Sequence, residues 1–437
     1  MLRTKLAGVL PSLFLLINSI SWFSLTFFVV LDLAGPFDKK VEILSSSYFG
    51  VMFAYFAALI ASAVIGATLF NSSMKKRKSL IAWISIGGLV CMVASALNPI
   101  VGSINAILVS LSLGAMSGLG IPACLASFSE NSKSKSRGRY GAVAFFAIQV
   151  LTAIFYFLMS WVSLPSKFLV LGAWRLIGGL GLFSSVPVVA VENKRNSSLL
   201  NIIRDRTFFL YFLPWFLFCI VNFVEEPIIE VYFSSEWYQI VTLLISSCTA
   251  FVGGVLCDFR GRKFSGILGF ILLGLGYAFL SFPIFDPFLS KILYLAFEGV
   301  AWGILYVTFI FVIWGDIAET KNREKYYLLG CMPFLLSNLI SGMARYLEVL
   351  PSSTFSLAAL FLFLAVIPLL YAPETLSDKI LKARELKNYI EKARKQVAKA
   401  QEKEREESRS EYEEIGPRFE LNSDEFVETE EVAEKTY

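Results

Sequence analysis

Twelve runs of predominantly apolar residues follow one another along this 437-residue chain, each about 20 residues or more in length. A helix rises 1.5 Å per residue, so about 20 residues cross the ~30 Å hydrocarbon core of a bilayer. Because lipid offers no hydrogen bonds, a spanning segment must satisfy its own backbone, as a helix does. The runs predict transmembrane helices near residues 6–33, 47–70, 80–100, 103–128, 141–163, 168–191, 207–232, 237–257, 264–284, 290–315, 326–349 and 353–372.

The composition leads to the same class of protein. Hydrophobic residues make up 56% of the chain, and the mean hydropathy is +0.64. A soluble domain this apolar would need an improbably large core, whereas a bilayer accepts such helices directly. We therefore predict an all-α, polytopic membrane protein.

Lysine and arginine concentrate in alternate loops, and this pattern sets the predicted orientation. Short loops rich in these residues stay on the cytoplasmic side. If both termini are cytoplasmic, the outer loops hold few basic residues, namely Lys39, Lys40, Lys167 and Lys291. The net charge of +4 then reflects membrane topology, and we expect no nucleic-acid partner.

A short cationic bridge joins the eighth and ninth predicted spans and contains Gly254, Asp258, Gly261, Arg262 and Lys263. Its pattern, Gly-x-Leu-x-Asp-x-x-Gly-Arg-Lys, resembles the signature loop of the major facilitator superfamily. The resemblance implies twelve helices in two six-helix repeats and transport by alternating access. It also implies that these five residues form a gating loop, with Asp258 capping a neighbouring helix. The alternative is a cluster of cations that only orients the helices.

Internal spacing supports two related halves. Glu130 and Arg137 follow the fourth span as Asp316 and Arg323 follow the tenth, with equal separation along the chain. The first half has Asn71 where the family has an aspartate, so a carboxylate latch is not expected there. We predict an N-terminal six-helix bundle over residues 1–191, a cytoplasmic linker over 192–206, a C-terminal bundle over 207–372 and a charged cytoplasmic tail over 373–437.

Glu298 is the leading candidate for a functional group within a span. An ionisable side chain at membrane depth is costly, so it usually faces a cavity or a partner. Glu298 lies near the middle of the tenth predicted span, and the chain has no histidine. A buried carboxylate is then the natural proton carrier. The alternative is that Glu298 only bonds to neighbouring helices.

Other polar residues within spans are further candidates for substrate or proton binding. Asn222, Glu225 and Glu226 share one helical face just before Pro227, unless they merely mark the outer end of that span. In the first span, Asn18 and Trp22 have the comparable spacing, although interhelical contact is the simpler account. Single polar candidates are Gln149 in the fifth span and Asn338 in the eleventh.

Arg175, in the sixth span, is expected to pair with a carboxylate or to extend its side chain to the membrane surface. The six cysteines have no metal-ligand spacing, and we expect no metal and no cofactor. In the tail, apolar residues three and four apart between Ala383 and Ala400 predict an amphipathic helix or a short coiled coil.

These features favour a monomeric secondary transporter, not an enzyme, that moves a small solute across the cell membrane, with H⁺ as a candidate co-substrate for symport. One alternative is a membrane sensor or scaffold that displays the tail. Another is a lipid-directed membrane enzyme, which would need paired aspartates at a span mouth or a metal cluster.

Overall fold

The structure is a computed structural model. It describes residues 2–35, 47–70, 73–97, 103–180, 197–233, 237–282, 286–319, 322–344 and 351–376, together with much of 382–406. The described residues form helices and short connections, without strands. Their contacts divide the chain into one unit over residues 1–376 and a second over 377–437.

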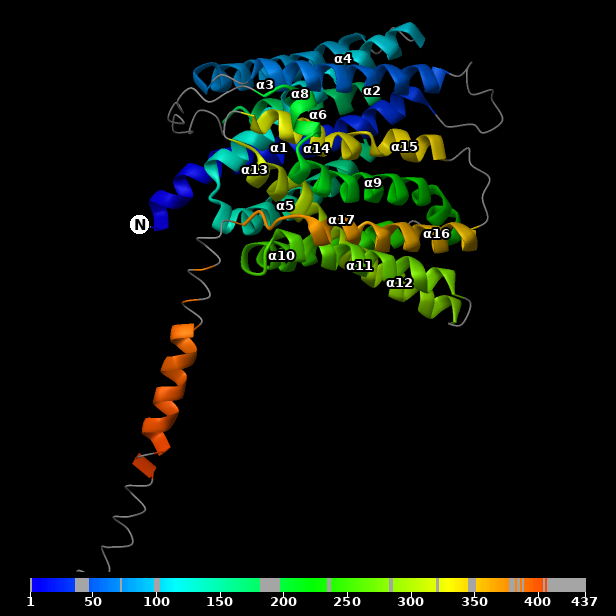
Figure 1. The fold of residues 1–437 in the computed structure, drawn as a ribbon. Helices are drawn as coiled ribbons and strands as arrows, with labels where there is room; N and C mark the ends of the chain where they lie inside the picture. Colours follow the sequence, from blue (N-terminus) through cyan, green and yellow to red (C-terminus); the bar gives the residue numbers. More distant parts are fainter. Residues whose placement is uncertain are drawn as a thin grey trace, which may run out of the picture. The chain divides into compact units, whose positions relative to one another are not determined.

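Long helices dominate the first unit and run roughly side by side (Figure 1). The N-terminal half contains α1 (Leu2–Ala34), α2 (Ser47–Leu69), α3 (Ser73–Leu97), α4 (Ser103–Asn131), η1 (Ser134–Ser136), α5 (Arg137–Ser160) and α6 (Leu164–Ile177). The connection to the C-terminal half includes α8 (Leu199–Ile203).

The C-terminal half repeats this arrangement with more interruptions. It contains α9 (Arg206–Phe233), α10 (Trp237–Phe259), α11 (Arg262–Ser281), α12 (Pro287–Tyr306), η2 (Val307–Ile313), α13 (Trp314–Ile317), α14 (Arg323–Leu335), α15 (Ser337–Ala344), α16 (Pro351–Leu364) and α17 (Val366–Tyr371). Three of these, α12, η2 and α13, form one continuous helical rod in which the η2 turns are π-helical.

The described residues contain eleven helices long and apolar enough to cross a membrane, and this confirms a multi-pass membrane protein. Each lies on one of the predicted spans. The twelfth prediction, residues 168–191, begins within α6, and its part beyond residue 180 lies outside the described residues. The same holds for residues 192–196 of the predicted linker and for Asn71.

Local sequence accounts for the start of α12. Asp286 accepts hydrogen bonds from the backbone N–H groups of Phe288 and Leu289, and Pro287 occupies the first turn. Both features favour helix initiation at this point, because the cap satisfies otherwise unpaired N–H groups. The cap sets the start of the helix that carries Glu298.

Glycines bring the helices of the two halves together. A Cβ atom at Gly254 of α10 would collide with the Gly138 carbonyl and the Ala142 side chain of α5. Small residues permit this close approach between membrane helices. The α5–α10 contact therefore fixes one seam between the N-terminal and C-terminal halves.

In the second unit, residues 389–403 are helical, as the apolar spacing predicts. Ile390 and Val397 on this helix are exposed.

Candidate functional site

A cavity of about 720 Å³ lies between the two halves. Its lining comes from α1, α4 and α5 on one side and from α9, α10, α12, α14 and α15 on the other. It reaches from Ile121 of α4 and Ile310 of η2 to Leu31, Gly35 and Tyr48 at one end of the helices. This volume is within the range of small-molecule binding sites in proteins.

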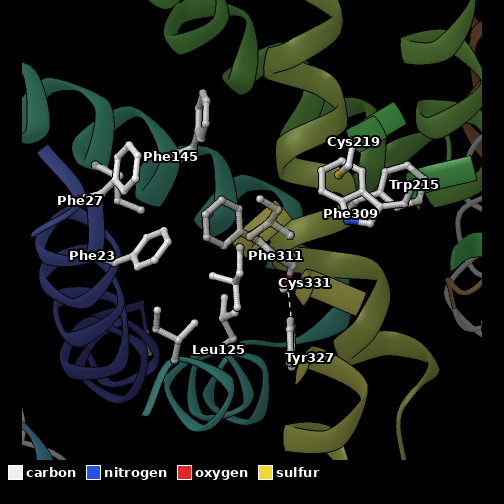
Figure 2. Packing of buried hydrophobic residues seen from close by; sticks show 14 of the residues in the cluster. Phe23, Phe27, Leu125, Phe145, Trp215, Cys219, Phe309, Phe311, Tyr327 and Cys331 are labelled. Carbon is white, nitrogen blue, oxygen red and sulfur yellow. Dashed lines mark hydrogen bonds between the residues drawn. The ribbon is translucent and has the colours of Figure 1, made fainter. Parts of the chain in front are cut away.

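The N-terminal wall of the cavity is mainly aromatic and aliphatic. Phe23 and Phe27, one turn apart on α1, line it together with Phe28 of α1 and Phe145 of α5. Figure 2 shows Phe23 and Phe27 on α1 facing the space in front of Phe311, whose carbonyl accepts a hydrogen bond from Tyr327. Polar groups on this wall are neutral and few, including Gln149 and Thr152 of α5.

The C-terminal wall is acidic. Asn222, Glu226 and Glu230 lie four residues apart on α9 and all line the cavity, so they form one stripe along the helix. Glu298 of α12 lines the cavity as well. Gln239 Nε2 donates to Glu230 Oε1 at 3.2 Å.

Glu298 lines the cavity and accepts a hydrogen bond from the neighbouring helix α10. Thr242 Oγ1 of α10 donates to Glu298 Oε2 at 3.1 Å, and the residue is 7% exposed. Gly299 allows α10 to approach closely, since a Cβ atom there would lie 2.6 Å from the Ile245 side chain. Thr249 Oγ1 of α10 also donates to the Gly299 carbonyl at 3.2 Å. Trp302 and Tyr306 continue the same face of α12 along the cavity.

The structure brings only some of the predicted candidates together. Those that line the cavity are Glu298, Asn222, Glu226, Gln149 and Asn338. Glu225, although adjacent to Glu226, points to Thr354 of α16 and does not line the cavity. Successive helical residues differ by about 100° in direction, so the side chains of Glu225 and Glu226 leave α9 on different sides.

Asn18 and Trp22 lie inside the N-terminal half and do not line the cavity. Asn18 Nδ2 donates to the Trp174 carbonyl at 2.7 Å, and its Oδ1 accepts from Arg175 at 3.4 Å. Asn18 and Trp22 therefore make contacts between α1 and α6. Interhelical contact was the alternative to a binding role in the sequence analysis.

Arg175 is enclosed by aromatic rings. Its Cζ atom lies 3.8 Å from the centre of the Trp83 ring and 4.6 Å from that of Trp22, and its Nη1 donates to Ser19 Oγ at 3.0 Å. The side chain is fully buried, and no ion pair forms with it among the described residues. The expectation of a carboxylate partner or an exposed guanidinium is therefore wrong, because two tryptophan faces and neutral oxygens take that place.

At the end of the helices away from the cavity mouth, Asp258, a residue of the predicted gating loop, joins the halves. Its carboxylate accepts from the backbone N–H groups of Gly138 at 2.9 Å and Arg139 at 3.2 Å, at the start of α5. Arg139 Nε adds a contact of 3.1 Å. A buried aspartate thus caps a helix of the opposite half, where the positive end of the helix dipole favours it.

A second junction forms around Asp316. The Asp316 carboxylate binds Arg137 of the N-terminal half and Arg262 Nε, the latter at 2.8 Å. Arg262 also donates to the Ser134 carbonyl. The sequence flagged Arg137 and Asp316 as repeat landmarks, but it gave no sign that they contact each other.

Lys76 of α3 lies between two acids from different halves. Its Nζ is 3.0 Å from Glu130 of α4 and 2.7 Å from Glu324 of α14. Sequence analysis missed Glu324 as a partner. Its position could have indicated a partner, because Glu324 lies between Arg323 and Lys325, in the segment of the second half that corresponds to Arg137–Arg139 of the first.

Glu374, which follows the last span, contacts the predicted gating loop. It accepts from the backbone N–H groups of Arg262 at 2.9 Å and Lys263 at 3.2 Å, and so caps α11. Gly261 has φ = 109° at this point, a conformation that favours glycine. Sequence analysis also missed Glu374, although its position directly after Pro373 hinted at an ordered turn.

Comparison with known proteins identifies the fold. No protein-family model and no curated protein matches the chain. Among solved structures, a double-tryptophan mutant of XylE matches with a TM-score of 0.62 and 14% identity, covering 88% of this chain and 98% of that one. A second structure, the major facilitator superfamily proton:xylose symporter XylE bound to 6-bromo-6-deoxy-D-glucose, matches with a TM-score of 0.58 and 13% identity. This match covers 85% of this chain and 95% of that one. The chain therefore has the major facilitator fold.

Proposed function

We propose that this protein is a secondary active transporter that moves a small solute across the membrane by alternating access. The observation that carries the proposal is the cavity between the halves, which reaches one end of the helices while buried ion pairs join the halves at the other end. Transporters of this architecture hold substrate near the midplane and rock one repeat against the other. XylE, with the same fold, is a symporter, which supports the proposal.

In this proposal the protein lies in the cell membrane, and the joined end and both termini face the cytoplasm, because short loops rich in lysine and arginine stay on that side. The structure then corresponds to the state in which the cavity opens outward. Asp258, Arg262 and Asp316 act on the gate in this proposal. Their contacts must separate before the cavity can open inward, because each bridges the N-terminal and C-terminal halves.

Glu298 is the proposed proton carrier. It lines the cavity and accepts a hydrogen bond from the Thr242 hydroxyl. A hydroxyl can donate to a charged carboxylate or accept from a protonated carboxyl group, so this contact is compatible with both states. A carboxylate at this depth is costly while charged, so protonation and substrate binding are expected to influence each other.

The test begins with a thermal-shift screen of metabolites against the detergent-solubilised protein. A ligand at 100 times its Kd adds about 2.7 kcal/mol to a two-state fold, which is readily detected. Uptake of the identified ligand into proteoliposomes is then measured with and without an inward proton gradient.

We expect saturable uptake that the gradient accelerates, and gradient-independent uptake by Glu298→Gln. Binding without uptake would reject transport. Uptake that does not depend on pH in either protein would reject coupling through Glu298 and leave transport intact.

A further inference from the structure

The helix of the second unit carries an apolar stripe. Ile390, Ala393 and Val397 follow one another at intervals of three and four residues, so they lie on one face of the helix over residues 389–403. Tyr389 and Arg394 line the same groove as these three residues. All described residues between 382 and 406 are exposed. The stripe is therefore accessible to a partner outside the described part of the chain.

Charge is distributed unevenly around this helix. Successive residues turn by about 100°, so Arg394 lies about 60° from Val397 around the axis. Glu391 and Glu402 lie about 120° and about 140° from Val397, on the polar side. Glu391 is there within 4.0 Å of Lys395. A cation therefore borders the apolar stripe, and the acids are turned away from it.

The surrounding sequence adds to the positive charge. Residues 379–405 contain ten lysines and arginines and four glutamates. Lys382 and Leu386 are helical and precede Ile390 by two turns and by one turn, so Lys382 is a second cation on the side of the stripe. Long basic side chains beside an apolar stripe lay their hydrocarbon part on a lipid surface and keep the charge at the phosphates. An apolar stripe with a basic border is typical of helices that lie on anionic membranes.

The chain attaches this helix close to the bilayer. The last candidate membrane span ends at Tyr371, and Lys382 follows eleven residues later. Eleven extended residues reach at most ~40 Å. The tether keeps the local concentration of lipid headgroups high, which strengthens a weak interaction without any new contact.

A second copy of the helix is a poorer partner for the stripe. In a parallel coiled coil, residues 389–403 would place Ala393 and Ala400 at the d positions of the seam. Alanine buries little apolar area, and the segment spans only about two heptads. Gln396 and Gln401, which would face each other beside the seam, carry no opposite charges to fix the pairing. The pattern of charge favours a lipid surface.

We propose that the helix over residues 389–403 binds the headgroups of anionic lipids, with its apolar stripe toward the acyl chains and Arg394 at the phosphates. This interaction is additional to transport and does not depend on what the cavity binds. In the proposed orientation the tail meets the cytoplasmic leaflet, which carries the anionic lipids.

The experiment measures amide hydrogen exchange of residues 389–403 in the full-length protein. The protein is placed at low salt in nanodiscs of phosphatidylcholine, or of phosphatidylcholine mixed equally with phosphatidylglycerol. We expect exchange about tenfold slower in the anionic nanodiscs, because binding stabilises the hydrogen bonds of the helix. Salt at about 1 M, where the screening length is ~3 Å, should remove most of this difference. Equal exchange rates in the two lipids, fast or slow, would overturn the proposal.

Two substitutions that remove the same charge locate the interaction. Arg394→Gln, at the border of the stripe, should reduce the protection about fivefold, equal to about 1 kcal/mol. Lys399→Gln is the matched control, because Lys399 lies about 160° from Val397 around the axis, and it should reduce the protection less than about twofold. Equal losses in the two variants would overturn the assignment of this face.

A third variant tests the apolar contact. Ile390→Gln removes the largest aliphatic side chain of the stripe over residues 389–403 and keeps a good helix former in its place. It should abolish the difference in exchange between the two lipids. Full protection of this variant in anionic nanodiscs would show that the stripe does not enter the lipid surface, and would overturn the proposal.

Other occupants of the stripe would give different results. The sequence 411–437 holds ten acidic and two basic residues, so it is a rival within the chain. Protection that is equal in both lipids and is lost on truncation after Arg409 would assign the stripe to this segment. Protection that requires two copies of the protein in one nanodisc would assign it to a second copy. Either result would overturn lipid binding.

Discussion

The two halves share an architecture but treat buried charge in opposite ways. In the N-terminal half, Arg175 is fully buried between Trp22 and Trp83 and does not line the cavity. The C-terminal half directs Glu226, Glu230 and Glu298 into the cavity. Charge at membrane depth is stabilised either by rings and fixed dipoles or by contact with a water-accessible space. Among the described lining residues, one half therefore supplies a mainly apolar wall and the other supplies the carboxyl groups.

At the joined end this division disappears, because both halves contribute charges. Arg137 and Asp316 come from different halves, as do Lys76 and Glu324. A buried ion pair adds little net stability, because the cost of removing both charges from water offsets their attraction. Removing one partner is nevertheless strongly destabilising, because it leaves an uncompensated buried charge. The ends of the halves are therefore electrostatically dependent on each other, in contrast to the two cavity walls.

The largest effect is expected where one acid serves both halves. Asp316→Asn leaves two buried guanidinium groups, those of Arg137 and Arg262, without their carboxylate. Loss of one member of a buried pair typically costs about 3–5 kcal/mol, so the outward-open state should be destabilised by that order. Thermal unfolding and the labelling rate of an introduced cysteine at Ser134 measure the change.

The matched control for this prediction is Asp286→Asn, since Asp286 is an exposed cap that contacts only its own helix. It should cost about 1 kcal/mol or less and leave cysteine labelling unaltered, because asparagine is also a good N-cap. Similar behaviour of the two variants would refute the role given to Asp316.

A smaller effect is expected inside the N-terminal half. Arg175→Lys keeps the charge but loses the planar group between Trp22 and Trp83, and we expect a loss of about 2 kcal/mol of unfolding free energy. Arg260→Lys is the control, because Arg260 is exposed and 5.8 Å from a single ring. The affinity for the ligand identified by the thermal-shift screen should be unchanged in both. A tenfold change in Arg175→Lys would break the separation between the caged cation and the cavity.

The spans were predictable because apolar length is a one-dimensional signal that the bilayer imposes. Every described membrane helix lies on a predicted span. The η2 turns and the break at Leu336 after Pro333 were not predicted, since they depend on packing around already apolar helices. The predicted division into bundles at 191 and 207 stays a prediction.

The site was predictable only in part, because sequence gives residue type and spacing but not the rotation of a helix. Glu225 and Glu226 are indistinguishable in sequence, yet only Glu226 lines the cavity. The enclosure of Arg175 needs rings from α1 and α3, and spacing on α6 cannot indicate them. The functional roles of all these residues stay proposals.

An intermediate prediction concerns the apolar wall. Phe27→Leu keeps the wall apolar but removes a ring face, so the ligand identified by the thermal-shift screen should bind about fivefold more weakly, a loss of about 1 kcal/mol. Proton dependence should stay intact, because Glu298 is unaltered. Phe157→Leu is the control, since Phe157 is exposed on α5 and does not line the cavity. An equal effect of both variants would show that the aromatic wall does not contact the ligand.

The smallest effect is expected from truncation after Leu376, which removes the second unit and keeps all helices of both halves. We expect unchanged uptake and a change within about 0.5 kcal/mol in unfolding free energy, as for surface changes away from buried features. Truncation after Ala372 should cost more, about 1 kcal/mol, because it also removes the Glu374 cap on Arg262 and Lys263. Uptake assays and thermal unfolding of the two truncated proteins measure the difference. If the protein truncated after Leu376 keeps its helices folded but loses function, the result would favour a scaffold that acts through its tail. It would count against a transporter whose substrate binds in the cavity between the two halves.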